Sequence, residues 1–111
     1  MTMKPLVTKD QFQAMDIRVG KVTKAERKEG ADKLIRLTVE FGEEGTRNIL
    51  TSLYPLYEPE TFEGKNFIFL LNLEPRKFMG EESQGMILCA DGEPISRLTT
   101  LEESTPGSSI T

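Results

Sequence analysis

The most constraining feature of the sequence is a stretch in which apolar and polar side chains alternate. Ile35, Leu37, Val39 and Phe41 occupy every second position, and charged or hydroxyl side chains stand between them. A period of two places successive side chains on opposite faces of a β-strand. Residues 35–41 therefore predict a strand with one face in a hydrophobic core and the other face in solvent.

Four further segments have strand-forming sequence, namely residues 17–22, 47–52, 66–73 and 86–90. The third of these is apolar on both faces, so we expect a central strand, or one whose second face is covered by a loop or another subunit. In the first segment the alternation slips by one position at Gly20. That slip predicts a bulge or a sharp bend at the glycine, as in strands that curl into barrels.

The segments between the predicted strands also contain recognisable sequence patterns. Thr8 and Gln11 have the spacing of a capping box, which predicts a short helix over residues 9–15. Residues 53–64 form a long connection with at most a turn of helix near residues 59–62. Five strands of regular spacing and one midway connection predict a small closed β-barrel, although an SH3-like barrel or a small sandwich fits the periodicity nearly as well.

The charges of the chain are unevenly distributed. The formal net charge is −4, yet residues 16–39 carry seven cations against four anions, and residues 64–80 are also net positive. The acidic excess lies in residues 40–63 and 81–111. A local cationic stripe can meet phosphates while the acidic remainder suppresses indiscriminate binding. The alternative interpretation is that these cations only solvate the outer faces of strands.

The composition argues against several classes of function. The 111 residues suit one domain, and no run approaches the roughly 18 apolar residues of a membrane span. The first residues lack the apolar core of a secretory signal. The chain has no histidine and one cysteine, Cys89, which we interpret as a small buried hydrophobe. We therefore expect a cytoplasmic protein with no membrane partner, catalytic activity, cofactor or metal ion.

Residues 72–86 bring amide, cationic, hydroxyl and thioether side chains into one loop between two predicted strands. Loops held between rigid elements are common positions for binding residues. Glu81 and Glu82 lie in the same loop and add negative charge beside its cations.

Several motifs together resemble the tRNA-binding OB-fold domains, which occur as freestanding dimers and at the C-termini of methionyl-tRNA synthetases. The motifs follow the family's order along most of the chain, which makes the series more specific than any one of them. They are DIRVGKV at 16–22, ADKL at 31–34, FG at 41–42, NL at 72–73, Pro75, Gly80 and SQGMIL at 83–88.

The resemblance implies an all-β fold: a five-stranded OB-fold Greek-key barrel with a short N-terminal helix and a C-terminal dimerisation extension. It implies a single tRNA-binding domain over residues 1–111, with a core of about residues 12–92 and an extension over residues 93–111. The resemblance implies that the Pro-Gly-Ser element of this extension, at residues 106–108, takes part in forming a homodimer. It further implies binding to the tRNA body by shape and backbone contacts.

The resemblance also implies site residues. Lys33 matches the basic position of the family's Asp-Lys-Leu motif, Asn72 its strand-end amide and Lys77 its loop lysine, while Ser83 and Met86 match its binding loop. The full predicted RNA-binding set is Lys33, Arg36, Asn72, Arg76, Lys77, Ser83, Gln84 and Met86.

The chemistry of this set suits folded RNA. Cations contact phosphates, which makes binding salt dependent. Asn72 and Ser83 suit 2′-hydroxyls or base edges, and Met86 offers a flexible apolar surface to a base. The phenylalanines fall mostly on inward phases, so the sequence offers no obvious aromatic platform for stacked bases.

Several of these residues have a second interpretation. Asn72 is equally suited to tie down the loop by bonding backbone groups, and Ser83 to act as a turn residue. Asp16 and Arg18 are expected to pair structurally near the first bend.

Two functions remain as hypotheses. The first is a non-catalytic, homodimeric tRNA-binding protein of protein biosynthesis, either autonomous or the detached β-subunit of methionyl-tRNA synthetase. The alternative is a secretion-type chaperone that binds extended peptides in the dimer groove, lined by Met86 and the region of Tyr54 and Tyr57. Enzymatic function ranks last, because the carboxylates of the loop have no histidine or metal to work with.

Overall fold

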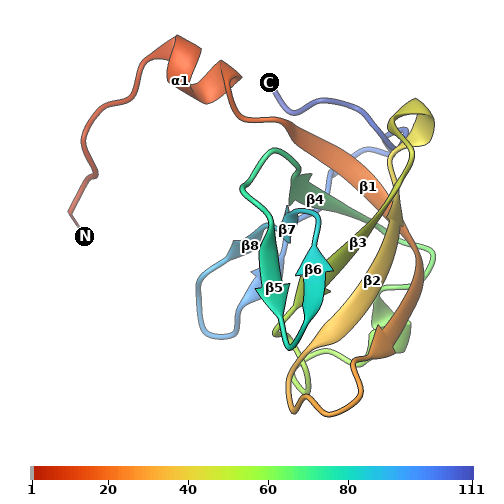
Figure 1. Cartoon of the computed structure of the whole chain (residues 1–111). Coiled ribbons are helices and arrows are strands. Elements are labelled where there is room, and N and C mark those ends of the chain that lie inside the picture. The colour runs from red at the N-terminus through yellow and green to blue at the C-terminus, as the bar shows by residue number, and fades with distance from the viewer. Residues whose placement is uncertain (1) are drawn as a thin grey trace.

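Five strands form one antiparallel sheet in the order β3-β2-β1-β4-β7 in the computed structural model, which describes residues 2–111. Their bounds are β1 Ile17–Arg27, β2 Ile35–Glu40, β3 Thr46–Thr51, β4 Asn66–Leu70 and β7 Met86–Ile87. The sheet curls until its two end strands, β3 and β7, approach each other (Figure 1). The prediction of a five-stranded barrel of the OB type is therefore confirmed.

Shorter elements lie outside the five-stranded sheet. They are α1 (Lys9–Gln13), the 3-10 turns η1 (Gly42–Glu44) and η2 (Pro59–Thr61), the hairpin β5 (Arg76–Phe78) and β6 (Glu81–Ser83), and the pair β8 (Cys89–Ala90) and β9 (Ser96–Arg97). The predicted capping box is present, since Gln11 N–H donates to Thr8 Oγ1 at 3.0 Å and Thr8 N–H to Gln11 Oε1 at 2.7 Å. The sequence thus placed the start of α1 correctly.

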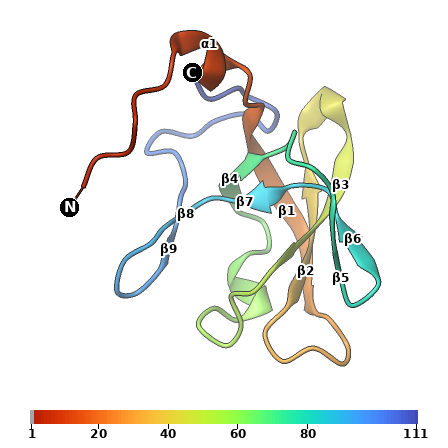
Figure 2. The same ribbon diagram turned by 60° about the vertical axis from the view of Figure 1, so that its left-hand side comes forward.

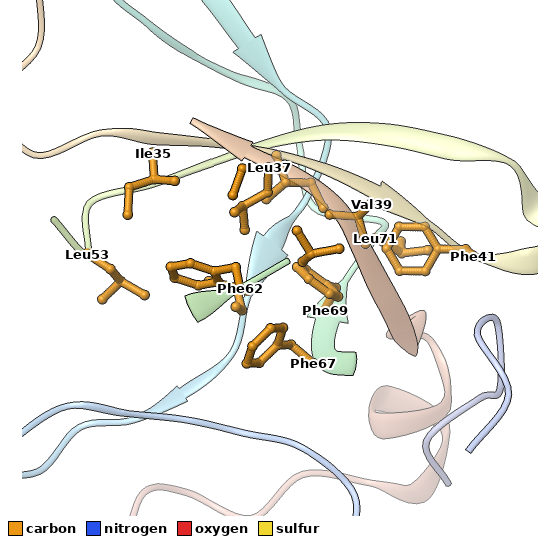
Figure 3. Packing of buried hydrophobic residues seen from close by; sticks show 13 residues of the cluster. Ile35, Leu37, Val39, Phe41, Leu53, Phe62, Phe67, Phe69 and Leu71 are labelled. Atoms are coloured by element: carbon orange, nitrogen blue, oxygen red, sulfur yellow. The ribbon is translucent and has the colours of Figure 1, made fainter. Parts of the chain in front are cut away.

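The alternation in β2 produces the core as predicted. Its apolar side chains are buried and the residues between them are partly exposed. Phe41 meets Phe69 of β4 edge to face at 5.5 Å, and η2 brings Phe62 into the same cluster (Figure 3). Edge-to-face aromatic pairs add to the stabilisation from burial. The core therefore joins both halves of the barrel.

The predicted bend at Gly20 is wrong in position and in cause. Gly20 pairs regularly with Phe67, and the register of β1 shifts later, between Val22 and Lys24. Gly20 occupies its position because a Cβ atom there would lie 2.5 Å from Cε1 of Phe41. The glycine makes room for a core aromatic ring, and the bulge three residues later lets β1 pass from β4 to β2.

The C-terminal segment covers an open edge of β1. Val19 N–H donates to Ser108 O at 2.9 Å, Gly107 N–H donates to Val19 O at 2.7 Å, and Ile110 N–H donates to Ile17 O at 2.9 Å. These bonds satisfy backbone groups of β1 that β2 does not reach. The Pro-Gly-Ser element at 106–108 lies against its own chain, and its part in a dimer stays a prediction.

The apolar strand β4 is central, as predicted, with β1 on one side and β7 on the other. Ile68 on its second face is only 7% exposed within the single chain. The predicted strand over residues 86–90 is instead two short strands, β7 and β8, because Cys89 pairs with Arg97 of β9. Cys89 is half-buried, and burial raises the pKa of its thiol.

Candidate functional site

The β5–β6 hairpin is the most exposed element of the predicted binding loop. Its two-residue turn, Met79-Gly80, has positive φ at both positions, 51° and 82°, which is the geometry of a type I′ turn. Arg76 pairs with Ser83 and Phe78 pairs with Glu81. Directly opposite residues share a face of a hairpin, so these four side chains face the barrel. Lys77 and its partner Glu82 lie on the outer face.

Glu81 anchors the hairpin to the barrel. Its carboxylate accepts hydrogen bonds from Arg36 Nε and Nη2, both at 2.7 Å, from Lys28 Nζ at 2.9 Å and from Asn48 Nδ2 at 3.0 Å. The bond from Arg36, with those from Lys28 and Asn48, holds the pKa of Glu81 well below its usual range. The same bond, together with one that Arg36 donates to Glu26, raises the pKa of Arg36. We call these five residues the Glu81 cluster.

The Glu81 cluster changes the charge expected at the site. Glu81 is not a free negative charge beside the loop, because Lys28 and Arg36 of the cationic stripe neutralise it. Arg36 is in turn bound to Glu81 and, at 3.0 Å, to Glu26. The positive charge that this surface can offer to a ligand therefore lies on residues other than Arg36.

Ser83 and Gln84 join the end of the hairpin to β3. Ser83 is 4% exposed, and its hydroxyl accepts from Leu50 N–H and donates to Gly85 O, both at 2.9 Å. Gln84 Oε1 accepts from Asn48 N–H at 2.8 Å, and Gln84 N–H donates to Asn48 O at 2.8 Å. These bonds link β3 to the end of β6 and to the segment between β6 and β7, so the barrel closes partly through side chains.

Asn72 ties the end of β4 to the link between α1 and β1. Its Oδ1 accepts from Asp16 N–H and its Nδ2 donates to Ala14 O, both at 2.7 Å. This is the tethering interpretation considered for Asn72 from the sequence. The predicted pair of Asp16 and Arg18 is confirmed, with Arg18 Nε 2.7 Å from the Asp16 carboxylate.

A groove of about 360 Å³ lies between the inner face of the hairpin, the end of β3 and the start of β7. We call it the hairpin groove. Leu73, Arg76, Phe78 and Met86 line it, together with residues 50–53. Lys33 lies just beyond the end of that last segment, since its carbonyl accepts from Tyr54 N–H at 3.1 Å.

The structure thus divides the predicted RNA-binding residues into two groups. Arg76 and Met86 line the hairpin groove, Lys33 is exposed beyond one end of it, and Lys77 is exposed on the outer face of the hairpin. Arg36, Asn72, Ser83 and Gln84 bond to other parts of the protein. Contact with RNA stays a prediction for all eight.

Sequence reasoning missed Phe78. The ring is half-buried, lines the groove and lies with its centroid 5.3 Å from the guanidinium carbon of Arg76. The site therefore holds one aromatic side chain that the prediction of no obvious stacking platform left out. The signal was present in the alternation of residues 76–78, which places Phe78 on the same face as Arg76.

The tyrosines expected in the peptide groove of a dimer are partly buried against the core of the single chain. Tyr57 donates its hydroxyl to Ile95 O at 2.6 Å and stacks with Arg97, and the guanidinium carbon of Arg27 lies 3.9 Å from the centre of the Tyr54 ring. Neither lines the hairpin groove. Over residues 2–111 no three Cys, Asp or Glu side chains gather as metal ligands, and no helix has the length and apolar character needed to cross a bilayer.

Comparisons with known proteins identify related sequences. Residues 17–109 match the family described as "Putative tRNA binding domain". A methionine–tRNA ligase of Methanocella arvoryzae is 41% identical over 96% of this chain and 16% of its own length. That of Archaeoglobus fulgidus is 43% identical over 99% of this chain and 17% of its own length. The chain spans about one sixth of these relatives.

Solved structures agree with the fold. A MetRS-related protein from Pyrococcus horikoshii superimposes with a TM-score of 0.90 and 39% identity, over 97% of this chain and 100% of that one. The chaperone CsaA from Bacillus anthracis superimposes with a TM-score of 0.88 and 28% identity, over 96% and 100% of the two chains.

Proposed function

The chain belongs to the family of tRNA-binding domains, and from that membership we propose that it binds the body of tRNA in the cytoplasm without catalysing a reaction. The match over residues 17–109 carries the proposal, because it covers the whole barrel and the hairpin. Binding is by shape and backbone contacts, which suits folded RNA whose base edges are mostly paired.

The exposed cations supply the phosphate contacts. Lys33, Arg76 and Lys77 are exposed and come from the β1–β2 loop and from the hairpin. The Glu81 cluster draws these two parts of the chain together, since Lys28 lies in that loop and Arg36 lies near the start of β2. In this proposal Arg36, Asn72, Ser83 and Gln84 hold the surface in shape, and Met86 packs against the RNA.

Retention of bulk tRNA over a salt series tests the proposal. Each lysine that neutralises one phosphate contributes about 1 to the slope of log affinity against log salt. We therefore expect Lys33→Ala and Lys77→Ala each to weaken binding and to lower that slope by about 1. Lys65→Ala is the matched control, since Lys65 is exposed beside β4, away from the hairpin groove. Undetectable binding of the unmodified protein at about 50 mM salt would overturn the proposal.

We also propose that the protein acts as a homodimer. Residues 2–7 form an arm that extends away from the barrel (Figures 1 and 2). Leu6 is 94% exposed and Val7 65%, and α1 buries none of its own side chains. Apolar surface of this kind marks an interface. Light scattering at micromolar concentration should give the mass of two chains; the mass of one would contradict the dimer.

A role beside methionyl-tRNA synthetase follows from the relatives. Two methionine–tRNA ligases resemble this chain over only 16% and 17% of their length. We propose that the chain serves such an enzyme as a detached tRNA-binding subunit in protein biosynthesis. Added to a methionyl-tRNA synthetase that lacks this domain, it should lower the KM for tRNA and leave the KM for methionine unchanged. An unchanged KM for tRNA would exclude this role.

The likeness to a chaperone favours one alternative function, the binding of extended apolar peptides. The apolar side chains of the hairpin groove are the observation that supports it. Aggregation of an unfolded protein, followed by light scattering, separates the two functions. Tight tRNA binding without protection from aggregation would exclude the chaperone function.

A further inference from the structure

Three apolar side chains from different segments meet in the hairpin groove. Phe78 comes from β5, Met86 from β7 and Leu73 from the link before the hairpin. Met86 is 39% exposed and Leu73 is 38% exposed. Apolar surface gathered in a concave site beside a guanidinium is typical of a ligand position rather than of scattered surface residues.

Five polar or charged side chains line the groove, Thr51, Ser52, Glu74, Arg76 and Ser83, and the last of these is already engaged. The Ser83 hydroxyl is bonded at both its donor and its acceptor positions within the protein, so it has no free donor with which to read the edge of a base. Arg76 and Glu74 both line the groove, so its lining holds opposite charges. A run of phosphates is therefore a poor occupant, and a flat, uncharged group is a good one.

The volume of the groove further limits which ligand it can hold. Its volume of about 360 Å³ lies at the small end of the range of ligand sites, which is about 300–1,000 Å³. That leaves room for one nucleotide rather than for a strand of stacked bases. An aromatic ring, a thioether and an arginine plane are the surfaces on which proteins stack bases that are not paired.

We propose that the hairpin groove takes one unpaired, unstacked RNA base, which stacks on Phe78 and packs against Met86, with Arg76 on its adjoining phosphate. The inference rests on the proposed tRNA-binding function and names the part of the RNA that the groove recognises. Because recognition is through the face of the base, it is tolerant of base identity. The protein therefore distinguishes RNA with an exposed loop base from RNA that is fully paired.

Two RNA probes with the same number of phosphates test this. One is a stem with an unpaired loop that carries 2-aminopurine, whose emission is quenched on stacking, and the other is a fully paired duplex. The chain contains no tryptophan, which simplifies the fluorescence measurement. We expect the unmodified protein to bind the loop RNA more tightly than the duplex and to quench the probe.

The variant Phe78→Leu keeps an apolar side chain in the hairpin and removes the ring. We expect it to bind the loop RNA about 5- to 50-fold more weakly, with the quenching lost. Its affinity for the duplex and its salt slope should not change, because no charge is removed. Leu56→Ala, at an exposed apolar residue outside the groove, is the control and should behave as the unmodified protein.

The outcomes separate this inference from the proposed function. Equal affinity of Phe78→Leu and the unmodified protein for the loop RNA would overturn the base site and leave tRNA binding intact. An equal loss for loop and duplex RNA would also overturn it, because Phe78 would then act through the fold of the hairpin. Failure of the unmodified protein to bind bulk tRNA would overturn the proposed function itself.

Discussion

At Gly20 the packing of the core leaves no room for a side chain. The ring of Phe41 and the Val39 methyl group occupy the space where a Cβ atom would lie, at 2.5 Å and 2.6 Å. Both neighbours are fully buried and belong to the alternating segment 35–41, which defines the fold. Interiors are packed densely enough that an added methyl group displaces its neighbours.

We predict that Gly20→Ala lowers the free energy of unfolding by about 1–3 kcal/mol. Gly92→Ala is the control, because its nearest neighbour beyond the adjoining residues, Pro94 O, would lie 3.6 Å from the new Cβ. That variant should change stability by less than about 1 kcal/mol. Urea denaturation measures both. Equal stability of the two variants would show that the core around Phe41 rearranges to accept the added methyl group.

At the scale of elements, the hairpin depends on one carboxylate for its place on the barrel. Glu81 bonds three side chains, and its exposed neighbour Glu82 faces away from the groove. A charge count treats the two glutamates alike, as unfavourable for RNA. The structure gives them opposite roles, since only Glu81 holds the hairpin that carries Arg76 and Phe78.

We predict that Glu81→Gln weakens tRNA binding although it removes a negative charge, whereas Glu82→Gln leaves binding unchanged or strengthens it. Glu81→Gln should also lower the free energy of unfolding at pH 7 by about 1.5–3 kcal/mol, the range for hydrogen bonds to charged groups. Filter binding and denaturation measure the two effects. Tighter tRNA binding by Glu81→Gln would contradict the anchoring role.

The stability of the hairpin contact depends on pH with a definite sign. Folding lowers the pKa of Glu81, so its contribution is complete above the unfolded value of about 4.3. It is lost as the pH falls below that value, because the unfolded chain then takes up the proton first. The difference in stability between the unmodified protein and Glu81→Gln should therefore narrow below about pH 4. A difference that stays constant down to pH 2 would contradict the paired carboxylate.

At the scale of the whole molecule, α1 and the C-terminal residues lie at one end of the barrel, and the arm extends outward from α1 (Figure 1). A groove of about 650 Å³ separates α1 from residues 109–111. The hairpin groove belongs to a different set of elements. A dimer formed through the first end would therefore leave both hairpin grooves open to RNA.

We predict that Leu6→Ser combined with Val7→Ser gives a monomer with an unchanged barrel. If both copies grip one tRNA, the monomer should bind more weakly, and its salt slope should fall to about half. Leu56→Ser, which alters an exposed apolar residue in another part of the chain, is the control. Light scattering and the salt series provide the readouts; a dimeric arm variant would show that other surfaces join the copies.

The strands were predictable because their information is local. Alternation in β2, the capping box of α1 and the apolar pattern of β4 are each contained in a short window of sequence. The roles of the site residues were harder to predict. Asn72, Ser83 and Gln84 have side chains suited both to RNA and to backbone groups, and the choice depends on which backbone groups lie within about 3 Å.

The sequence by itself determined a barrel whose core is made by alternating strands, and through its motifs it identified the family. Only the tertiary structure decided where the charges and the aromatic surface of the loop lie. Residues 36 and 81 are distant in sequence but share hydrogen bonds of 2.7 Å, so Glu81 supports the basic stripe instead of opposing it. The hairpin register likewise turned Phe78 into the groove. The contacts of the Glu81 cluster join segments far apart in the chain, and no local pattern encodes them.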